Sequence, residues 1–179
     1  LYDIWSVLVF GLDVFDGIAT KLDVREFSPQ DVPSEIKQSV LEAARMTGTG
    51  LNTQHWRFIL VEGRDHLKKL AEDSTSGMWV VGASFAIIVL TNPKYKFHMI
   101  DAGRVAQNMQ LAAWNRGVAS GLFTGVREKE LRNDFGIPKD LNATIIVGFG
   151  YPARKLTGRK KDRVALGELV YYGRYGTTS

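Results

Sequence analysis

The chain has 179 residues, of which 45% are hydrophobic and 23% charged, and it has a formal net charge of +4. This composition is typical of a folded domain with a sizeable core, and it excludes a disordered or fibrous chain. The sequence contains no cysteine, which excludes disulfides, thiolate metal sites and a cysteine nucleophile and fits an intracellular, cytoplasmic protein.

Residues 1–11 are apolar, but they match neither a signal peptide nor a membrane span. The segment is short, is interrupted by Asp3, and lacks both a basic start and a small-residue cleavage site. We interpret residues 1–11 as an N-terminal packing extension, clipped or non-native at its first residue. We interpret residues 12–179 as a single domain, and we expect no membrane association.

The rest of the chain alternates between helical and strand patterns. Apolar residues at helical spacing predict helices over residues 34–46, 64–73, 101–117 and 127–138. Apolar runs predict strands over residues 56–62, 84–91, 118–123 and 143–152. The run at 84–91 is almost continuously apolar, which indicates a strand covered on both faces. The pattern predicts an α/β or α+β domain with a central sheet of about four strands.

Two glycine pairs lie at the ends of predicted elements, but neither forms a dinucleotide-binding fingerprint. Gly48 and Gly50 follow a helix and lack a third glycine, whereas Gly148 and Gly150 precede a Tyr-Pro pair instead of a helix. No phosphate-binding P-loop sequence is present. The three histidines are dispersed and suggest neither a catalytic triad nor metal-ligand spacing, so we expect no metal site.

Three segments are candidates for ligand binding. In KLDVREF, alternation in an extended segment places Lys21, Asp23 and Arg25 on one side, either as a cationic grip on an anion or as solvated surface charges. In ARMTGTGLNTQHWRF (44–58), the amides of Asn52 and Gln54 suit the edge of a heterocycle, although an ordinary helix-to-strand loop explains them too.

The third segment, GRKKDR (158–163), offers cations for a phosphate, or it is a surface charge run. Basic residues gather mainly over 154–163 and not along a helical face. We therefore do not favour nucleic-acid binding.

Taken in order, these segments resemble the nitroreductase family of FMN-dependent oxidoreductases, in its small single-domain form. DVFDGIATKLDVREF resembles the family's opening helix and its Arg-Arg-Ser-x-Arg-x-Phe motif. EAARMTGTGLNTQHWRF resembles E-A-A-x-x-A-P-S-x-x-N-x-Q-P-W, and DAGRVAQNMQLAAWNRGVASG resembles D-x-G-x-A-x-Q-N-x-x-L-A-A-x-x-x-G. FGIPKD, IIVGFGYP and the basic KKDR follow at the expected places, so the resemblance covers roughly residues 12–170.

The resemblance implies an α+β three-layer sandwich, with a central, mainly antiparallel sheet flanked by helices, in an intertwined homodimer. FMN would bind at the dimer interface, and the C-terminal tail would wrap around the other subunit. Carried over by position, the cofactor contacts would be Lys21, Asp23, Arg25, Thr49, Asn52, Gln54, Thr124, Gly125, Lys161 and Arg163.

The resemblance also implies a role for each group of contacts. Lys21, Lys161 and Arg163 would face the phosphate, and Arg25 would face the pyrimidine ring. Thr49 and Asn52 would reach the flavin of the partner subunit. Thr124 and Gly125 would offer their backbones to the flavin ring.

The implied activity is hydride transfer from NADH or NADPH, through FMN, to a nitroaromatic, a quinone or a similar electron-poor acceptor. Turnover would be ping-pong, with no catalytic side chain. Two alternatives remain: a flavin-fragmenting or reductive dehalogenase-type enzyme of the same fold, and a flavin-binding protein without turnover. The short region between residues 73 and 100 argues against the elaborate lid of the first alternative.

Several positions depart from the family motifs. Asp23 stands where the motif has serine near the phosphate, so its charge would repel the dianion unless a neighbouring cation neutralises it. The change Asp23→Ser is therefore predicted to strengthen FMN binding. Gly48 and Thr49 replace a Pro-Ser pair, and His55 replaces the proline before Trp56.

Overall fold

The structure is a computed structural model that describes residues 13–156 and 161–177. The extension predicted for residues 1–11 and the first three residues of the basic run 158–163 lie outside the described residues.

All eight elements predicted from the patterns are present. The strands are β1 (Arg57–Glu62), β2 (Phe85–Thr91), β3 (Ala119–Phe123) and β4 (Asn142–Gly150). The helices are α1 (Val14–Thr20), α2 (Ser34–Arg45), α3 (Arg64–Glu72), α4 (His98–Trp114) and α5 (Glu128–Asp134). Short 3₁₀ turns lie at η2 (Gly50–Asn52), η3 (Met78–Gly82) and η4 (Leu166–Glu168).

The largest single difference in boundary is at the end of α5, for which the pattern predicts 127–138. The helix ends at Asp134 because Gly136 adopts a φ of 62°, a left-handed conformation that turns the chain out of the helix. In the other direction, α4 begins three residues before its predicted start, so that Asp101 lies in its first turn. The short turn η3 was not predicted.

The four strands form one antiparallel sheet in the order β1-β2-β4-β3. Every residue of the central strand β2 is buried, as its continuous apolar run predicts. Alternate β2 side chains belong to two different cores: Phe85 and Ile87 lie on one face of the sheet, and Ala86 and Ile88 on the other.

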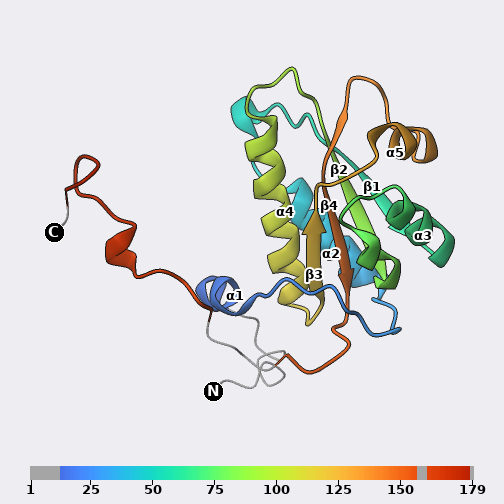
Figure 1. Ribbon diagram of the computed structural model, residues 1–179, viewed down its shortest axis with the longest axis horizontal. Coiled ribbons are helices and arrows are strands. Elements are labelled where there is room, and N and C mark those ends of the chain that lie inside the picture. Colours follow the sequence, from blue (N-terminus) through green and yellow to red (C-terminus); the bar gives the residue numbers. More distant parts are fainter. Residues whose placement is uncertain (1–12, 157–160, 178–179) are drawn as a thin grey trace.

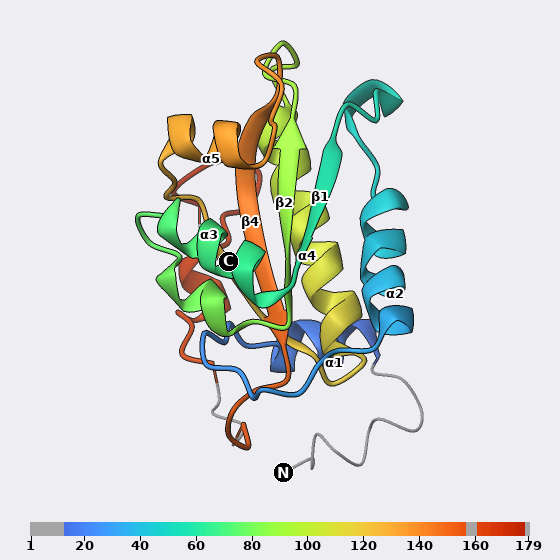
Figure 2. The ribbon, with the colours of Figure 1, turned by 90° about the vertical axis from the view of Figure 1, so that its right-hand side faces the viewer.

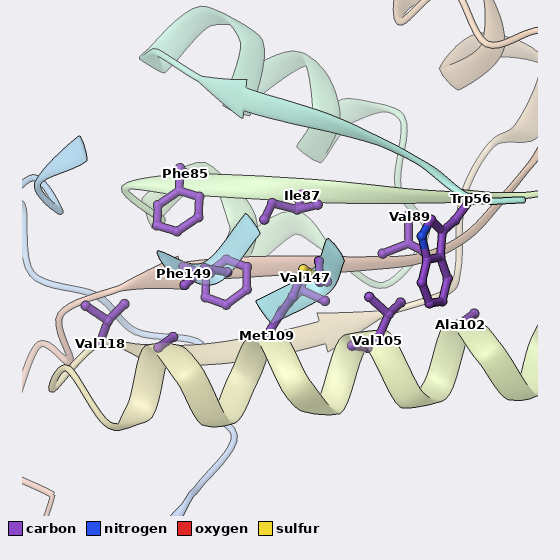
Figure 3. Close-up of a cluster of buried hydrophobic side chains, with 14 of the residues drawn as sticks. Trp56, Phe85, Ile87, Val89, Ala102, Val105, Met109, Val118, Val147 and Phe149 are labelled. Carbon is purple, nitrogen blue, oxygen red and sulfur yellow. The ribbon is translucent and has the colours of Figure 1, made fainter. Parts of the chain in front are cut away.

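Helices cover both faces of the sheet, which gives the three-layer α+β sandwich expected from the resemblance (Figure 2). On one face α2 and α4 pack on the sheet; Met109 of α4 reaches toward Val147, and Val105 lies by Val89 and Trp56 (Figure 3). The rings of Phe85 and Phe149 stack with their centroids 4.7 Å apart. On the other face α3, η3 and α5 enclose a second core.

Residues 161–177 form an arm that runs away from the sandwich (Figure 1). Most of its large apolar side chains are exposed; these are Val164, Leu166, Leu169, Tyr171, Tyr172 and Tyr175. An exposed apolar series of this kind is typical of a surface that packs on another molecule. The wrapping of the arm around a second subunit stays a prediction.

Candidate functional site

Residues 21–25 run as an extended segment beside β3. The backbone N–H of Val24 donates to the Ser120 carbonyl at 2.8 Å, and the Val24 side chain is buried. The neighbouring side chains at alternate positions come together: Lys21 Nζ lies 2.7 Å from Asp23 Oδ1. Only 10% of the Lys21 side chain is exposed, so this cation is held in place and is not a freely solvated charge.

The Asp23 carboxylate has two donors. Besides Lys21, Gln110 of α4 donates from Nε2 to Asp23 Oδ1 at 3.1 Å, and the same amide donates to Ser120 Oγ at 3.1 Å. Partial burial raises the pKa of the Asp23 carboxyl, but the hydrogen bond and charge of Lys21, with the Gln110 hydrogen bond, outweigh burial and lower it. Asp23 is therefore ionised at neutral pH, and Lys21 neutralises it.

Lys161 joins this group from the C-terminal arm. Its Nζ donates to the Ile18 carbonyl of α1 at 2.6 Å, which places it beside residues 21–23. Burial, together with the charges of Arg163 and Lys21, lowers the pKa of the Lys161 ammonium, and the charge of Asp23 opposes this shift. Cations that disfavour one another in this way are stabilised by a bound anion.

Arg25, the next residue at an alternate position, lies over a tryptophan ring. Its Cζ lies 5.9 Å from the ring centroid of Trp79, which in turn meets Phe123 edge to face at 5.7 Å. Phe123 ends β3, and Thr124 and Gly125 follow it directly. Trp79 thus connects Arg25 with the two backbone positions that the resemblance assigns to the flavin ring.

Gly125 is closely packed. A Cβ on Gly125 would lie 2.5 Å from Thr75 Oγ1 and 2.6 Å from Ser76 Oγ, so a larger residue would force these hydroxyls away. The Gly125 carbonyl also accepts from the Thr75 backbone N–H at 2.9 Å. Thr124 is exposed beside this contact.

The glycine-containing bend, residues 48–54, lies against the N-terminal part of α4 (Figure 1). Just before it, Thr47 Oγ1 accepts from Asn108 Nδ2 at 2.7 Å, and within it Thr49 Oγ1 accepts from the Gln54 backbone N–H at 2.9 Å. The Asn52 and Gln54 side chains are exposed.

One subunit does not bring all ten predicted residues to one place. Gln110, which contacts Asp23, is nine residues along α4 from Asp101, which contacts the bend. At 1.5 Å per helical residue, this spacing separates the two groups by roughly 13 Å along the helix axis. Lys21, Asp23 and Lys161 therefore form one group, and the bend with Thr49, Asn52 and Gln54 forms another.

Two cavities lie near residues 21–31, and a third, of about 630 Å³, lies where residues 46–48 meet α4 and is lined by none of the ten predicted residues. One, of about 400 Å³, lies between residues 23–26 and 152–156, and Asp23 and Arg25 contribute to its wall. The other, of about 440 Å³, lies by residues 28–31 and the start of α3. None of the ten predicted residues lines the second cavity, so we place the candidate site at the first.

Within residues 13–156 and 161–177, no three His, Asp or Glu side chains are grouped as metal ligands would be. In the same part of the chain, none of the helices has the length and apolar character needed to cross a membrane.

Sequence reasoning missed four residues that shape these groups. Asp101 and Gln110 are polar residues on the buried side of α4, and this break in an apolar stripe is the signal that could have identified them. His55 is also buried, but the sequence showed it only as a departure from a motif. Trp79 lies in η3, for which no element was predicted, so no pattern indicated its place beside Arg25.

Comparison with known proteins decides the family. The model of the nitroreductase family matches residues 18–92 and 82–151, which together span more than half of the chain. The chain belongs to the nitroreductase family. This confirms the resemblance carried by the sequence motifs.

Two archaeal members of the nitroreductase family are similar over most of their length. One, from Archaeoglobus fulgidus, is 34% identical over 145 residues, which are 75% of this chain and 83% of the relative. The other, from Methanothermobacter thermautotrophicus, is 30% identical over 151 residues, which are 79% of this chain and 78% of the relative. Both names give a proposed NADH dehydrogenase/NAD(P)H nitroreductase activity.

The solved structure of an FMN-dependent nitroreductase from Clostridium difficile R20291 has the same fold. The TM-score is 0.83 at 20% sequence identity, and the match covers 90% of this chain and 100% of the other. At this identity the likeness establishes the shared fold.

Proposed function

We propose that this nitroreductase-family protein is an FMN-dependent oxidoreductase that uses NADH or NADPH to reduce an electron-poor acceptor, such as a nitroaromatic or a quinone. The family and the names of the two archaeal relatives support an NAD(P)H-dependent oxidoreductase. The name of the C. difficile protein supports FMN as the cofactor. The observation that carries the proposal is a group of two cations and one anion. Lys21 neutralises the Asp23 carboxylate, and Lys161 adds a further positive charge beside them, which suits an anionic ligand.

The residues present fit FMN. Its phosphate is a dianion, and Lys21 and Lys161, with Arg163 two residues further along the chain, would hold it by charge-assisted hydrogen bonds. Arg25, held over Trp79, would face the pyrimidine side of the ring, and the backbone at the exposed Thr124 and at Gly125 would lie beside it. When bound, FMN supplies a two-electron carrier between the nicotinamide and the acceptor.

A homodimer would complete the site. Each chain holds its bend about 13 Å along α4 from its own cation group, and in a homodimer the bend of one subunit would serve the flavin of the other. The exposed apolar side chains of the arm offer a surface for the second copy.

A visible absorption spectrum of the purified protein tests the proposal. We expect a flavin spectrum, release of FMN on denaturation, bleaching by NADH or NADPH, and recovery of the colour with a nitroaromatic or a quinone. Parallel lines in double-reciprocal plots would support ping-pong turnover. A colourless protein that cannot be reconstituted with FMN would contradict the proposal.

A further inference from the structure

The bend at residues 48–54 has an unfavourable backbone. Leu51, Asn52 and Gln54 have φ angles of 51°, 52° and 44°, in the left-handed region that residues with a side chain rarely adopt. Three such residues within four positions persist only where neighbouring groups hold the chain in place.

A buried carboxylate of α4 holds the bend. Only 2% of the Asp101 side chain is exposed, and its oxygens accept from the Gly50 backbone N–H at 3.0 Å, from His55 Nε2 at 3.2 Å and from Arg104 at 3.4 Å. Asp101 therefore binds the start of the bend through Gly50 and its end through His55. A buried carboxylate with several donors is costly to disrupt, because each donor would be left without a partner.

The second contact of His55 fixes the direction of its hydrogen bond to Asp101. The Asn92 backbone N–H donates to His55 Nδ1 at 3.3 Å. Since Nδ1 accepts there, the ring proton is on Nε2, which donates to Asp101. The ring also packs against Tyr95, with their centroids 5.0 Å apart, so His55 is fixed in orientation as well as in hydrogen bonding.

Gly50 lies between Asp101 of α4 and Phe97, the residue just before α4. Its N–H meets Asp101, and a Cβ on Gly50 would lie 2.6 Å from the ring of Phe97. The contact on both sides leaves the bend little freedom at this residue.

We propose that Asp101 and His55 are positioning residues: together they form a clamp, the Asp101–His55 clamp, that holds residues 48–54 in the conformation needed to contact the cofactor. The proposal deepens the proposed function and rests on it, because the groups so positioned are Thr49 and Asn52. Asp101 and His55 are themselves too buried to touch the flavin.

Amide hydrogen exchange of the protein without FMN tests the clamp itself. In Asp101→Asn, exchange of peptides covering residues 46–56 should be about tenfold faster, because a charge-assisted hydrogen bond is lost. His55→Asn should act in the same direction, since its amide is too short to reach Asp101. His55→Gln, which can place an amide nitrogen near the former Nε2, should restore slow exchange. Asp65→Asn, an exposed acid in the first turn of α3, is the control for the loss of a helix-terminal charge.

FMN titration of the same variants tests the link to the cofactor. Asp101→Asn and His55→Asn should weaken FMN binding about tenfold, whereas His55→Gln and Asp65→Asn should bind as the wild type does. Urea unfolding of each variant separates this effect from a general loss of folding.

The possible results are distinct. Unchanged exchange of residues 46–56 in both Asp101→Asn and His55→Asn would refute the clamp. Faster exchange with unchanged FMN affinity would refute its role in positioning. If the wild-type protein binds no FMN, the proposed function fails and the positioning role with it, while the exchange data still decide whether the clamp exists.

Discussion

Replacing Asp23 with asparagine should tighten FMN binding. In the wild type, three cations (Lys21, Lys161 and Arg163) and the Asp23 carboxylate give this group a net charge of +2. The variant Asp23→Asn has the same shape and a net charge of +3, and it releases Lys21 from an ion pair of 2.7 Å.

The size of the effect follows from that ion pair. A hydrogen bond to a charged group contributes about 1.5–3 kcal/mol. The Asp23 side chain is 61% exposed, so solvent screening weakens its attraction to Lys21. The same screening reduces the gain in FMN affinity that follows when the charge of Asp23 is removed. We expect a gain of about 1.4 kcal/mol, which is about a tenfold lower Kd for FMN.

The assay is quenching of FMN fluorescence at several salt concentrations. Asp23→Asn should bind more tightly and depend more steeply on salt, because more charge takes part in binding. Lys21→Gln should have the opposite effect. Asp140→Asn, which removes an equal charge from the exposed turn before β4, should leave the Kd unchanged. An unchanged or higher Kd for Asp23→Asn would show that Asp23 does not lie near the phosphate.

Three further changes have defined outcomes. Removing residues 164–179 should shift the protein toward monomers in analytical ultracentrifugation, because the exposed apolar side chains of the arm are lost. Phe149→Ala should reduce the free energy of unfolding in urea by about 3–5 kcal/mol, since the ring is fully buried and stacked on Phe85. Burial, and then the charge of Asp134, raise the pKa of Asp73, so the contribution of Asp73 to stability falls as pH rises above its unfolded value of 3.8. Asp73→Asn removes this fall. The urea midpoint of the variant, relative to that of the wild type, should therefore be higher near neutral pH than below pH 3.8.

Most of the fold could be predicted from the sequence, because its elements have clear periodicity. The apolar run of β2 predicted a strand buried on both faces, and the stripe containing Val105 and Met109 predicted α4. The turn η3 could not be predicted, because a short 3₁₀ segment shows neither the periodicity of an α-helix nor that of a strand. Strand order was also beyond the patterns: β4 pairs with both β2 and β3, and these contacts link residues far apart in the sequence.

The candidate site was predicted only in part. Alternation placed Lys21 and Asp23 together, and the structure finds them in contact. The approach of Lys161 depends on the path of the C-terminal arm, and that of Gln110 on the packing of α4 against residues 21–25. Both are tertiary contacts without a local signal in the sequence. Only the resemblance could indicate the position of Lys161, and nothing indicated that of Gln110.

His55 shows how a departure from a motif can be compensated by tertiary structure. Where the family motif has a proline, whose ring fixes the backbone even in the unfolded chain, this chain has a histidine bound to Asp101 of α4. The rigidity of the bend therefore depends on α4 being folded and packed, and it is absent from the unfolded chain. If so, fraying of the first turn of α4 should release the bend, and slow exchange at residues 46–56 should be lost together with that of residues 98–102 as urea is raised. Loss of protection at the bend well before the start of α4 would show that Asp101 does not hold it.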